Sequence, residues 1–185
     1  MRVISGKARG TKIYTLDEKI TRPTLDRVKE SIFNIIQTRI EDCIFVDLFA
    51  GSGAIGIEAA SRGAKKVILC DKSKEAIEVI NKNIAKTHLT EKTEVYNCDY
   101  VSCLNKLKEK KVDIIYIDPP YALNLIENSI IEILKLDIIG ENSLLILETD
   151  DENRILNFLD TKKEFKIIDK RKYGRAYVIF ITKNY

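Results

Sequence analysis

The spacing of apolar residues divides the chain near residue 43. Beyond that point, short apolar runs alternate with stretches in which apolar residues recur every three or four positions. The runs predict buried strands, and the recurring pattern predicts amphipathic helices. The predicted strands cover residues 43–48, 66–70, 93–98, 112–117, 143–147, 165–169 and 176–182. The predicted helices cover residues 54–62, 74–86, 101–108, 125–136 and 151–159.

Apolar strands that are separated by helices are typical of a parallel sheet with both faces covered. The last two predicted strands are joined only by a short turn at Tyr173-Gly174. Because a parallel connection needs a longer crossover, these two strands must run in opposite directions. The pattern therefore predicts an α/β fold, a doubly wound Rossmann-like sheet with its last strand antiparallel.

Residues 1–40 follow a different pattern. Two short β-like runs, residues 2–5 and 11–14, flank a turn with a glycine at each end, which predicts a hairpin. Further along, apolar residues recur at spacings of three and four as far as Ile40, which predicts a helix. We therefore divide the chain into a hairpin-and-helix appendage, residues 1–40, that packs on the core, and a main domain, residues 41–185.

Charge is distributed unevenly along the chain. The formal net charge is +3, but residues 1–40 hold nine Lys and Arg against four Asp and Glu. The remaining residues hold 22 against 24, so the positive excess lies in the N-terminal segment. Such an excess indicates a polyanionic partner, although a solvated basic face would give the same balance.

The composition excludes several classes of protein and site. No apolar run approaches the ~18 residues of a membrane span, and no signal-peptide core follows Met1. The single histidine, His88, leaves no His-based metal site. The four cysteines form no C-x-x-C pair and are expected to be free thiols. We therefore expect a cytoplasmic protein with no membrane partner and no metal.

A glycine-rich turn follows the first strand of the main domain. Gly51, Gly53 and Gly56 fit the pattern G-x-G-x-x-G, and Asp71 ends the next predicted strand. This is the dinucleotide fingerprint, in which the acid accepts hydrogen bonds from ribose hydroxyls. Asp47 argues against NAD, because an acid just before the turn would face the pyrophosphate. It suits a cationic ligand instead, such as a sulfonium with an α-amino group.

The sequence Asp118-Pro119-Pro120-Tyr121 follows the strand predicted at residues 112–117. The prolines stiffen the exit from the strand, so the Asp118 carboxylate and the Pro119 carbonyl can point at one place. Both groups are acceptors and together can hold an NH₂ group. Tyr121 offers a flat face on which a heteroaromatic ring can stack. Such a site would orient an exocyclic amine toward an electrophile.

Acidic residues lie at or near the ends of five predicted strands. Ligands of open α/β sheets bind beyond the carboxyl ends of the strands. We therefore expect one acid-lined site rather than five separate capping or ion-pair residues. The five acids are Asp47, Asp71, Asp99, Asp118 and Glu148.

Taken together, these motifs resemble a known family. Asp47-x-Phe49-x-Gly51-x-Gly53 with Asp118-Pro119-Pro120-Tyr121 is similar to class I S-adenosylmethionine-dependent methyltransferases that act on amino groups. Arg22-Pro23-Thr24-x-Asp26-Arg27, followed by Phe33-Asn34, resembles the RsmD family of 16S ribosomal RNA guanine-N2 methyltransferases, as does Arg2-Val3-Ile4-Ser5-Gly6-Lys7. The likeness covers nearly the whole chain. Asp71 is a departure, since that family more often has Glu there.

The resemblance implies the seven-stranded methyltransferase sheet and methyl transfer from S-adenosylmethionine, with S-adenosylhomocysteine as a product. It also implies the substrate, which is the N2 amine of one guanine of 16S rRNA, guanine 966 in the usual rRNA numbering. The partner would be 16S rRNA or a 30S subunit assembly intermediate. We expect the enzyme to be a monomer.

Roles for individual residues also follow from the resemblance. The catalytic residues would be Asp118, Pro119, Pro120 and Tyr121. The cofactor would be bound by Asp47, Phe49, Gly51, Ser52, Gly53, Asp71, Lys72, Asp99 and Tyr100. In this scheme Asp71 binds the ribose and Asp99 the adenine amino group. RNA would be bound by Lys7, Arg9, Arg22, Arg27, Lys172 and Arg175. Arg22 and Arg27 could instead close over the cofactor, and each of these cations could be a surface side chain.

Three other functions stay open. A methyltransferase of this fold could act on adenine in DNA or on a protein glutamine, although the N-terminal segment disfavours both. An NAD-dependent oxidoreductase would explain the glycines and Asp71, but it leaves residues 118–121 unexplained. An RNA-binding assembly factor without catalysis could retain the fold.

Overall fold

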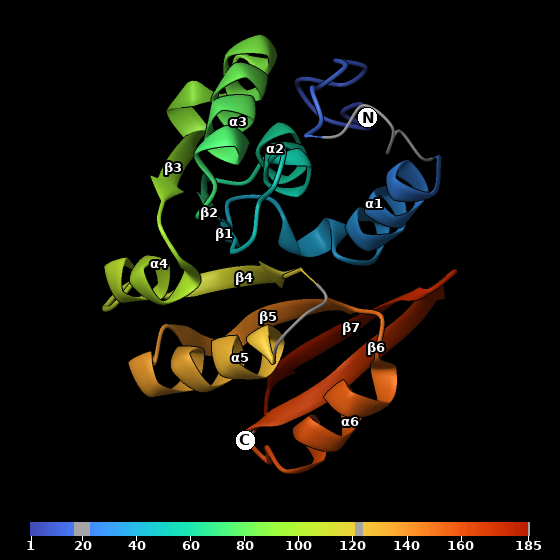
Figure 1. Ribbon diagram of the computed structural model, residues 1–185, viewed down its shortest axis with the longest axis vertical. Coiled ribbons are helices and arrows are strands. Elements are labelled where there is room, and N and C mark those ends of the chain that lie inside the picture. The colour runs from blue at the N-terminus through green and yellow to red at the C-terminus, as the bar shows by residue number, and fades with distance from the viewer. Residues whose placement is uncertain (17–22, 121–123, 185) are drawn as a thin grey trace.

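The computed structural model describes residues 1–16, 23–120 and 124–184. Seven strands form one mixed sheet in the order β3-β2-β1-β4-β5-β7-β6 (Figure 1). Strands β1 to β5 pair in parallel, whereas β7 runs antiparallel to both β5 and β6, which confirms the reversed last strand. The strands are β1 Ile44–Asp47, β2 Lys66–Asp71, β3 Thr93–Asn97, β4 Val112–Ile117, β5 Ile139–Thr149, β6 Phe165–Tyr173 and β7 Ala176–Lys183.

Helices cover both faces of the sheet, as the apolar strands predict (Figure 1). Helices α1 to α3 lie over one face and α4 to α6 over the other, and each face has its own apolar cluster. Along β4, Ile114 faces the first cluster and Ile115 the second, because successive side chains of a strand point to opposite faces. The helices are α1 Pro23–Ile35, α2 Ala54–Ser61, α3 Lys74–Thr87, α4 Tyr100–Lys106, α5 Leu125–Leu136 and α6 Glu152–Asp160.

Two N-terminal elements differ from the sequence prediction. The predicted helix ends at Ile35 and is followed by a 3₁₀ turn, Gln37–Arg39. Apolar spacing does not reveal this break, because Ile36 and Ile40 remain buried on the same side after it. The predicted hairpin is closed by a single antiparallel bridge between Arg2 and Lys12 rather than by two strands.

A buried carboxylate makes several of the contacts that fasten the N-terminal segment to the sheet domain. Glu58, in α2, accepts the backbone N–H groups of Ile4 and Ser5 at 2.8 and 3.0 Å. It also pairs with Lys29 of α1 at 3.1 Å and with Arg62 at 2.8 Å. Its charge is therefore compensated although Glu58 is completely buried. The apolar side chains of the hairpin and of α1 belong to the same cluster as those of α2 and α3.

No helix within the described ranges is long and apolar enough to cross a bilayer.

Candidate active site

The glycine turn joins β1 to α2 and uses its glycines in two ways. Gly51 has φ +54° and borders a cavity, and a Cβ there would have Leu16, at 3.9 Å, as its nearest neighbour among the described residues. Gly53 has φ +79° and is buried at the start of α2, where a Cβ would lie 3.0 Å from Leu69. A Cβ at Gly56 would lie as close, at 2.9 Å from Leu69. Gly51 therefore serves the cavity, whereas Gly53 and Gly56 let α2 approach β2.

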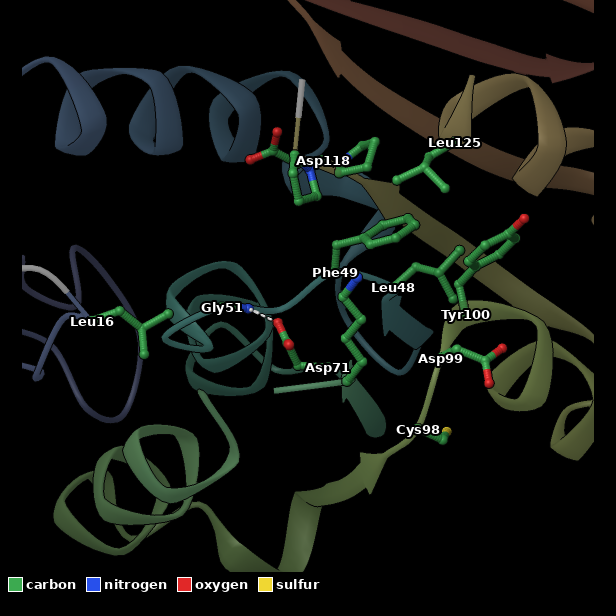
Figure 2. A pocket seen from close by; sticks show the side chains of 13 residues that line it. Leu16, Leu48, Phe49, Gly51, Asp71, Cys98, Asp99, Tyr100, Asp118 and Leu125 are labelled. Carbon is green, nitrogen blue, oxygen red and sulfur yellow. Dashed lines mark hydrogen bonds between the residues drawn. The ribbon is translucent and has the colours of Figure 1, made fainter. Parts of the chain in front are cut away.

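A cavity of about 680 Å³ opens at the carboxyl ends of the strands (Figure 2). Its volume lies within the range of small-molecule sites, roughly 300–1,000 Å³. Its position is the one expected for ligands of an open α/β sheet. Its lining consists of Leu16, Leu48, Phe49, Gly51, Asp71, Lys72, Cys98, Asp99, Tyr100, Asp118, Pro119, Pro120 and Leu125.

Asp71 supports the glycine turn from the end of β2. One carboxylate oxygen accepts the Gly51 N–H at 2.9 Å, a contact drawn in Figure 2, and the other accepts the Ser73 N–H at 2.9 Å. Each carboxylate oxygen can accept a second hydrogen bond. Asp71 can therefore hold the turn and still receive donors from a ligand in the cavity.

Asp99 and Tyr100 line the cavity just after β3, the strand that neighbours β2 (Figure 2). Asp99 is the N-cap of α4, and its carboxylate accepts the Ser102 N–H at 3.0 Å and the Ser102 hydroxyl at 2.8 Å. These hydrogen bonds lower the pKa of Asp99, the backbone one contributing most. The Tyr100 ring lies 5.6 Å from that of Phe49, so two aromatic side chains line this part of the cavity. Binding of an adenine amino group by Asp99 stays a prediction.

A second, smaller cavity of about 230 Å³ adjoins the glycine turn and is bordered by three carboxylates. Asp47, Asp118 and Glu148 line it, and Asp118 lines the large cavity as well. Asp47 ends β1 and pairs with Tyr116 of β4, and Glu148 lies near the end of β5. Asp47 and Glu148 lie two residues after Phe45 and Ile146, which belong to the apolar cluster on the α1 side of the sheet. Because alternate residues of a strand face the same side, both carboxylates point to the face that α1 covers. The acids that were expected to gather in one site thus form two groups that meet at Asp118.

Burial dominates the electrostatics of this acidic cavity. It raises the pKa of Asp47 to about 7, although the Gly56 N–H, which donates to this carboxylate at 3.1 Å, opposes the shift. The pKa of Asp118 is raised well above its usual value by burial and by the charges of Glu148 and Asp47. Burial also raises the pKa of Glu148, which accepts the Tyr116 hydroxyl. A cationic group placed here would find acceptors already gathered.

The other oxygen of Asp47 has no hydrogen-bond partner within the described residues, although it is buried. Lys29 also lines the small cavity, but its ammonium group pairs with Glu58 and donates to the Arg2 carbonyl. An unpaired buried carboxylate oxygen is costly unless a ligand supplies a donor. The acceptor groups of this cavity therefore fit a positively charged ligand, the kind of ligand that the sequence predicts from Asp47.

The remaining residues that the sequence predicts for the site lie in three kinds of place. Ser52 lines the small cavity. Tyr121 and Arg22 lie outside the described residues. The other predicted RNA-binding residues line neither of these cavities, and all are exposed. They are Lys7, Arg9, Arg27, Lys172 and Arg175.

Some residues of the site were missed by sequence reasoning. Leu16 and Leu125 line the large cavity, and no pattern in the sequence distinguishes them from other leucines. Lys29 lines the small one, and here a signal existed, because it is spaced four residues from Phe33 on the apolar face of α1. A lysine at an apolar position indicates a buried partner for its charge.

Known proteins resemble this chain over nearly its whole length. Residues 1–182 match the family described as "Conserved hypothetical protein 95". The chain is 33% identical over 185 residues to "Putative rRNA methyltransferase YlbH" of Bacillus subtilis (strain 168), with 99% of each protein covered. It is 34% identical over 158 residues to "Ribosomal RNA small subunit methyltransferase D" of Haemophilus influenzae, covering 84% of this chain and 82% of that protein.

A solved structure agrees with this relationship. The structure described as "Putative methyltransferase yhhF from Escherichia coli" superposes with a TM-score of 0.85 and 28% identity, covering 100% of this chain and 98% of the other. The sheet order, the cavity at the strand ends and these similarities confirm the family that the sequence predicted. The chain belongs to the family described as "Conserved hypothetical protein 95", which comprises the RsmD-like ribosomal RNA methyltransferases.

Proposed function

We propose that this protein transfers a methyl group from S-adenosylmethionine to the N2 amine of a guanine in 16S rRNA, guanine 966 in the usual numbering, within a 30S assembly intermediate. The observation that carries the proposal is the position of Asp118. This carboxylate lies where the large cavity meets the acidic one and directly precedes Pro119-Pro120. It can therefore approach both a cationic cofactor and the amine of a substrate.

The two cavities suit the parts of S-adenosylmethionine. Asp71 and the aromatic pair Phe49 and Tyr100 line the large cavity, which favours a nucleoside with a ribose diol and a flat base. The acidic cavity, with the unpaired oxygen of Asp47, favours the ammonium group of the methionine portion. S-adenosylmethionine, when bound, supplies an electrophilic methyl group on a sulfonium. The product would be S-adenosylhomocysteine.

Asp118 acts on the amine that receives the methyl group. The N2 amine of guanine is a weak nucleophile, because its lone pair is delocalised into the ring. Hydrogen bonds from its N–H groups to Asp118 and to the Pro119 carbonyl favour the tetrahedral nitrogen of the transition state, and holding the amine in place lowers the barrier further. Burial and neighbouring charges raise the pKa of Asp118, so this carboxylate can also take up the proton that the amine loses. Tyr121 would stack on the guanine, turned out of its loop.

RNA would bind beside α1 and the turn between β6 and β7. The Tyr173 hydroxyl contacts the Ser31 hydroxyl, which holds this turn against α1. Lys172 and Arg175 are exposed there, and Arg27 lies one helical turn from Ser31. Lys7 and Arg9, in the N-terminal hairpin, would extend the contact to further phosphates. Phosphate contacts by such side chains give affinity without sequence preference.

The test is methylation of ribosomal subunits in vitro. Small subunits from a strain without the corresponding gene are incubated with the protein and tritiated S-adenosylmethionine, and the rRNA is mapped by mass spectrometry. We expect one methyl group, on the N2 of one guanine. Small subunits from the parent strain serve as the control and should take up no label, because that guanine is already methylated.

Other outcomes would identify the competing functions. Label on DNA adenine or on a protein glutamine, with none on rRNA, would assign the chain to another class of amino methyltransferase. Binding of S-adenosylhomocysteine without transfer to any substrate would favour a non-catalytic assembly factor. Stabilisation by NAD but not by S-adenosylhomocysteine would favour an oxidoreductase.

A further inference from the structure

The side-chain amide of Asn83, in α3, is completely buried and makes three hydrogen bonds to backbone groups. Its oxygen accepts the Tyr14 N–H at 2.7 Å, and its nitrogen donates to the Tyr14 carbonyl at 2.9 Å. The same nitrogen donates to the Ser52 carbonyl at 2.9 Å. One side chain therefore holds both the N-terminal segment and the glycine turn. A buried amide that uses its donors and acceptor in this way fixes its partners closely.

The segment that Asn83 holds brings Leu16 to the large cavity. Leu16 follows Tyr14 by two residues and lines this cavity beside Gly51. Figure 2 shows it on the side of the glycine turn, across the cavity from Tyr100 and Leu125. Its side chain remains 43% exposed, so apolar area is left uncovered at the cavity wall. A ligand in this cavity would cover that area.

We propose that Leu16 contacts the cofactor and that Asn83 is the positioning residue that holds it there. This inference rests on the proposed function, because it takes S-adenosylmethionine as the occupant of the large cavity. The N-terminal segment then contributes a wall of the cofactor site in addition to its part in RNA binding. Asn83 fixes the position of the N-terminal segment relative to the glycine turn, because its side chain is hydrogen-bonded to the backbone of both Tyr14 and Ser52.

Calorimetric titration with S-adenosylhomocysteine tests the contact. We expect Leu16→Ala to weaken binding about five- to tenfold, because the removed carbons lose the apolar contact with the ligand. Ile131→Ala is the matched control: Ile131, in α5, is 45% exposed and lines neither cavity. This control should bind with the wild-type affinity. Equal affinity of wild type and Leu16→Ala would overturn the contact.

A double-mutant cycle tests the positioning role. Asn83→Ala should weaken binding by a similar factor in the wild-type background and by much less in the Leu16→Ala background, because the contact that it positions is then absent. Equal loss in both backgrounds, or a lower melting temperature with unchanged affinity, would show that Asn83 acts only on the fold or on the glycine turn. Asn83→Ser takes the place of Asn83→Ala in the cycle if the alanine variant does not fold.

The wild-type titration separates this inference from the proposed function. A wild-type protein that does not bind S-adenosylhomocysteine would overturn the proposed cofactor and this contact with it. A wild-type protein that binds, combined with unchanged binding by Leu16→Ala, would overturn only the contact.

Discussion

The carboxylate of Asp47 accepts the backbone N–H of Gly56 at 3.1 Å, so the end of β1 is hydrogen-bonded to the first turns of α2. This contact uses one oxygen and leaves the other facing the acidic cavity without a partner in the described part of the chain. Asp47 thus has both a structural partner and a vacant acceptor. Its protonation should influence the free energy of unfolding.

The stability of the ligand-free protein should fall as pH rises from about 4 to 7. Burial raises the pKa of Asp47 from 3.8 to about 7, so in this range the folded state binds the proton more tightly than the unfolded state. The stabilisation that comes from the tighter proton binding by folded Asp47 is complete below pH 3.8, the pKa of an ordinary Asp, and is lost as pH passes about 7. Asp47→Asn, which keeps an acceptor for Gly56, should flatten this dependence. Melting temperatures at several pH values measure it, and an identical slope in the variant would contradict the assignment.

Replacement of Asp118 should separate catalysis from cofactor binding. Asp118→Ala removes an acceptor for the substrate amine and should lower kcat by more than roughly 100-fold. Its affinity for S-adenosylhomocysteine should change by less than about tenfold, because the other lining residues remain. Tritium transfer and calorimetry measure the two quantities. Asp160→Ala, at the exposed end of α6, is the control for loss of a carboxylate. Near-normal turnover of Asp118→Ala would refute its role.

The buried carboxylate of Glu58 should contribute more to stability than an exposed one. Glu58→Ala leaves Lys29 and two backbone N–H groups without their partner and should cost about 3–5 kcal/mol. Glu94 pairs with Lys66 at 2.8 Å but is 39% exposed, so Glu94→Ala should cost less than about 1 kcal/mol. Urea unfolding of both variants gives the comparison. Equal costs would mean that the N-terminal segment is not held by Glu58.

The two glycines of the turn should respond differently to alanine. A Cβ at Gly53 would lie 3.0 Å from Leu69 and 3.2 Å from Ile80, so Gly53→Ala should cost about 2–4 kcal/mol through crowding and its positive φ. Among the described residues Gly51 has only Leu16 nearby, at 3.9 Å, and Gly51→Ala should cost roughly 1–2 kcal/mol from its positive φ. Urea unfolding distinguishes them. A smaller loss for Gly53→Ala than for Gly51→Ala would be inconsistent with the packing described.

The turn between β6 and β7 should contribute to RNA affinity. Replacing Lys172 and Arg175 together by Gln should weaken binding of 16S rRNA fragments and reduce the salt slope by about two, one per lost phosphate contact. Lys163 and Lys166 lie at the opposite end of β6 and carry the same charge, so their double Gln variant is the matched control. Filter binding at several salt concentrations tests this. Equal effects of the two pairs would indicate only a general loss of positive charge.

The sequence predicts the sheet well because most of its strands are buried on both faces. The run 112–117 agrees with β4 residue for residue, since nearly every side chain there contacts one of the two apolar clusters. The predicted strand 165–169 is too short, because β6 is an edge strand and its last residues, Lys170 to Tyr173, are largely exposed and polar. Apolar patterning detects burial, so it misses the solvated end of an edge strand.

The sequence predicts those residues of the candidate site whose position follows from the strand order alone. Carboxyl ends of parallel strands meet at one edge, so Asp47, Asp118 and Glu148 were expected near one another. Leu16 was not predictable, because its place depends on a hydrogen-bonded contact with α3, far along the chain. Asp99 shows a further limit: an acid before a helix is equally suited to cap that helix, and here it does so.

The interior position of β7 constrains the order in which the chain can fold. Among the described strands, β6 pairs only with β7, which is synthesised after it, and β5 also has β7 as its neighbour. During translation β5 therefore has an open edge, and β6 has no strand to pair with, until residues 176–183 have left the ribosome. The C-terminal part of the sheet, from β5 through β7 to β6, can therefore be completed only after β7 is available.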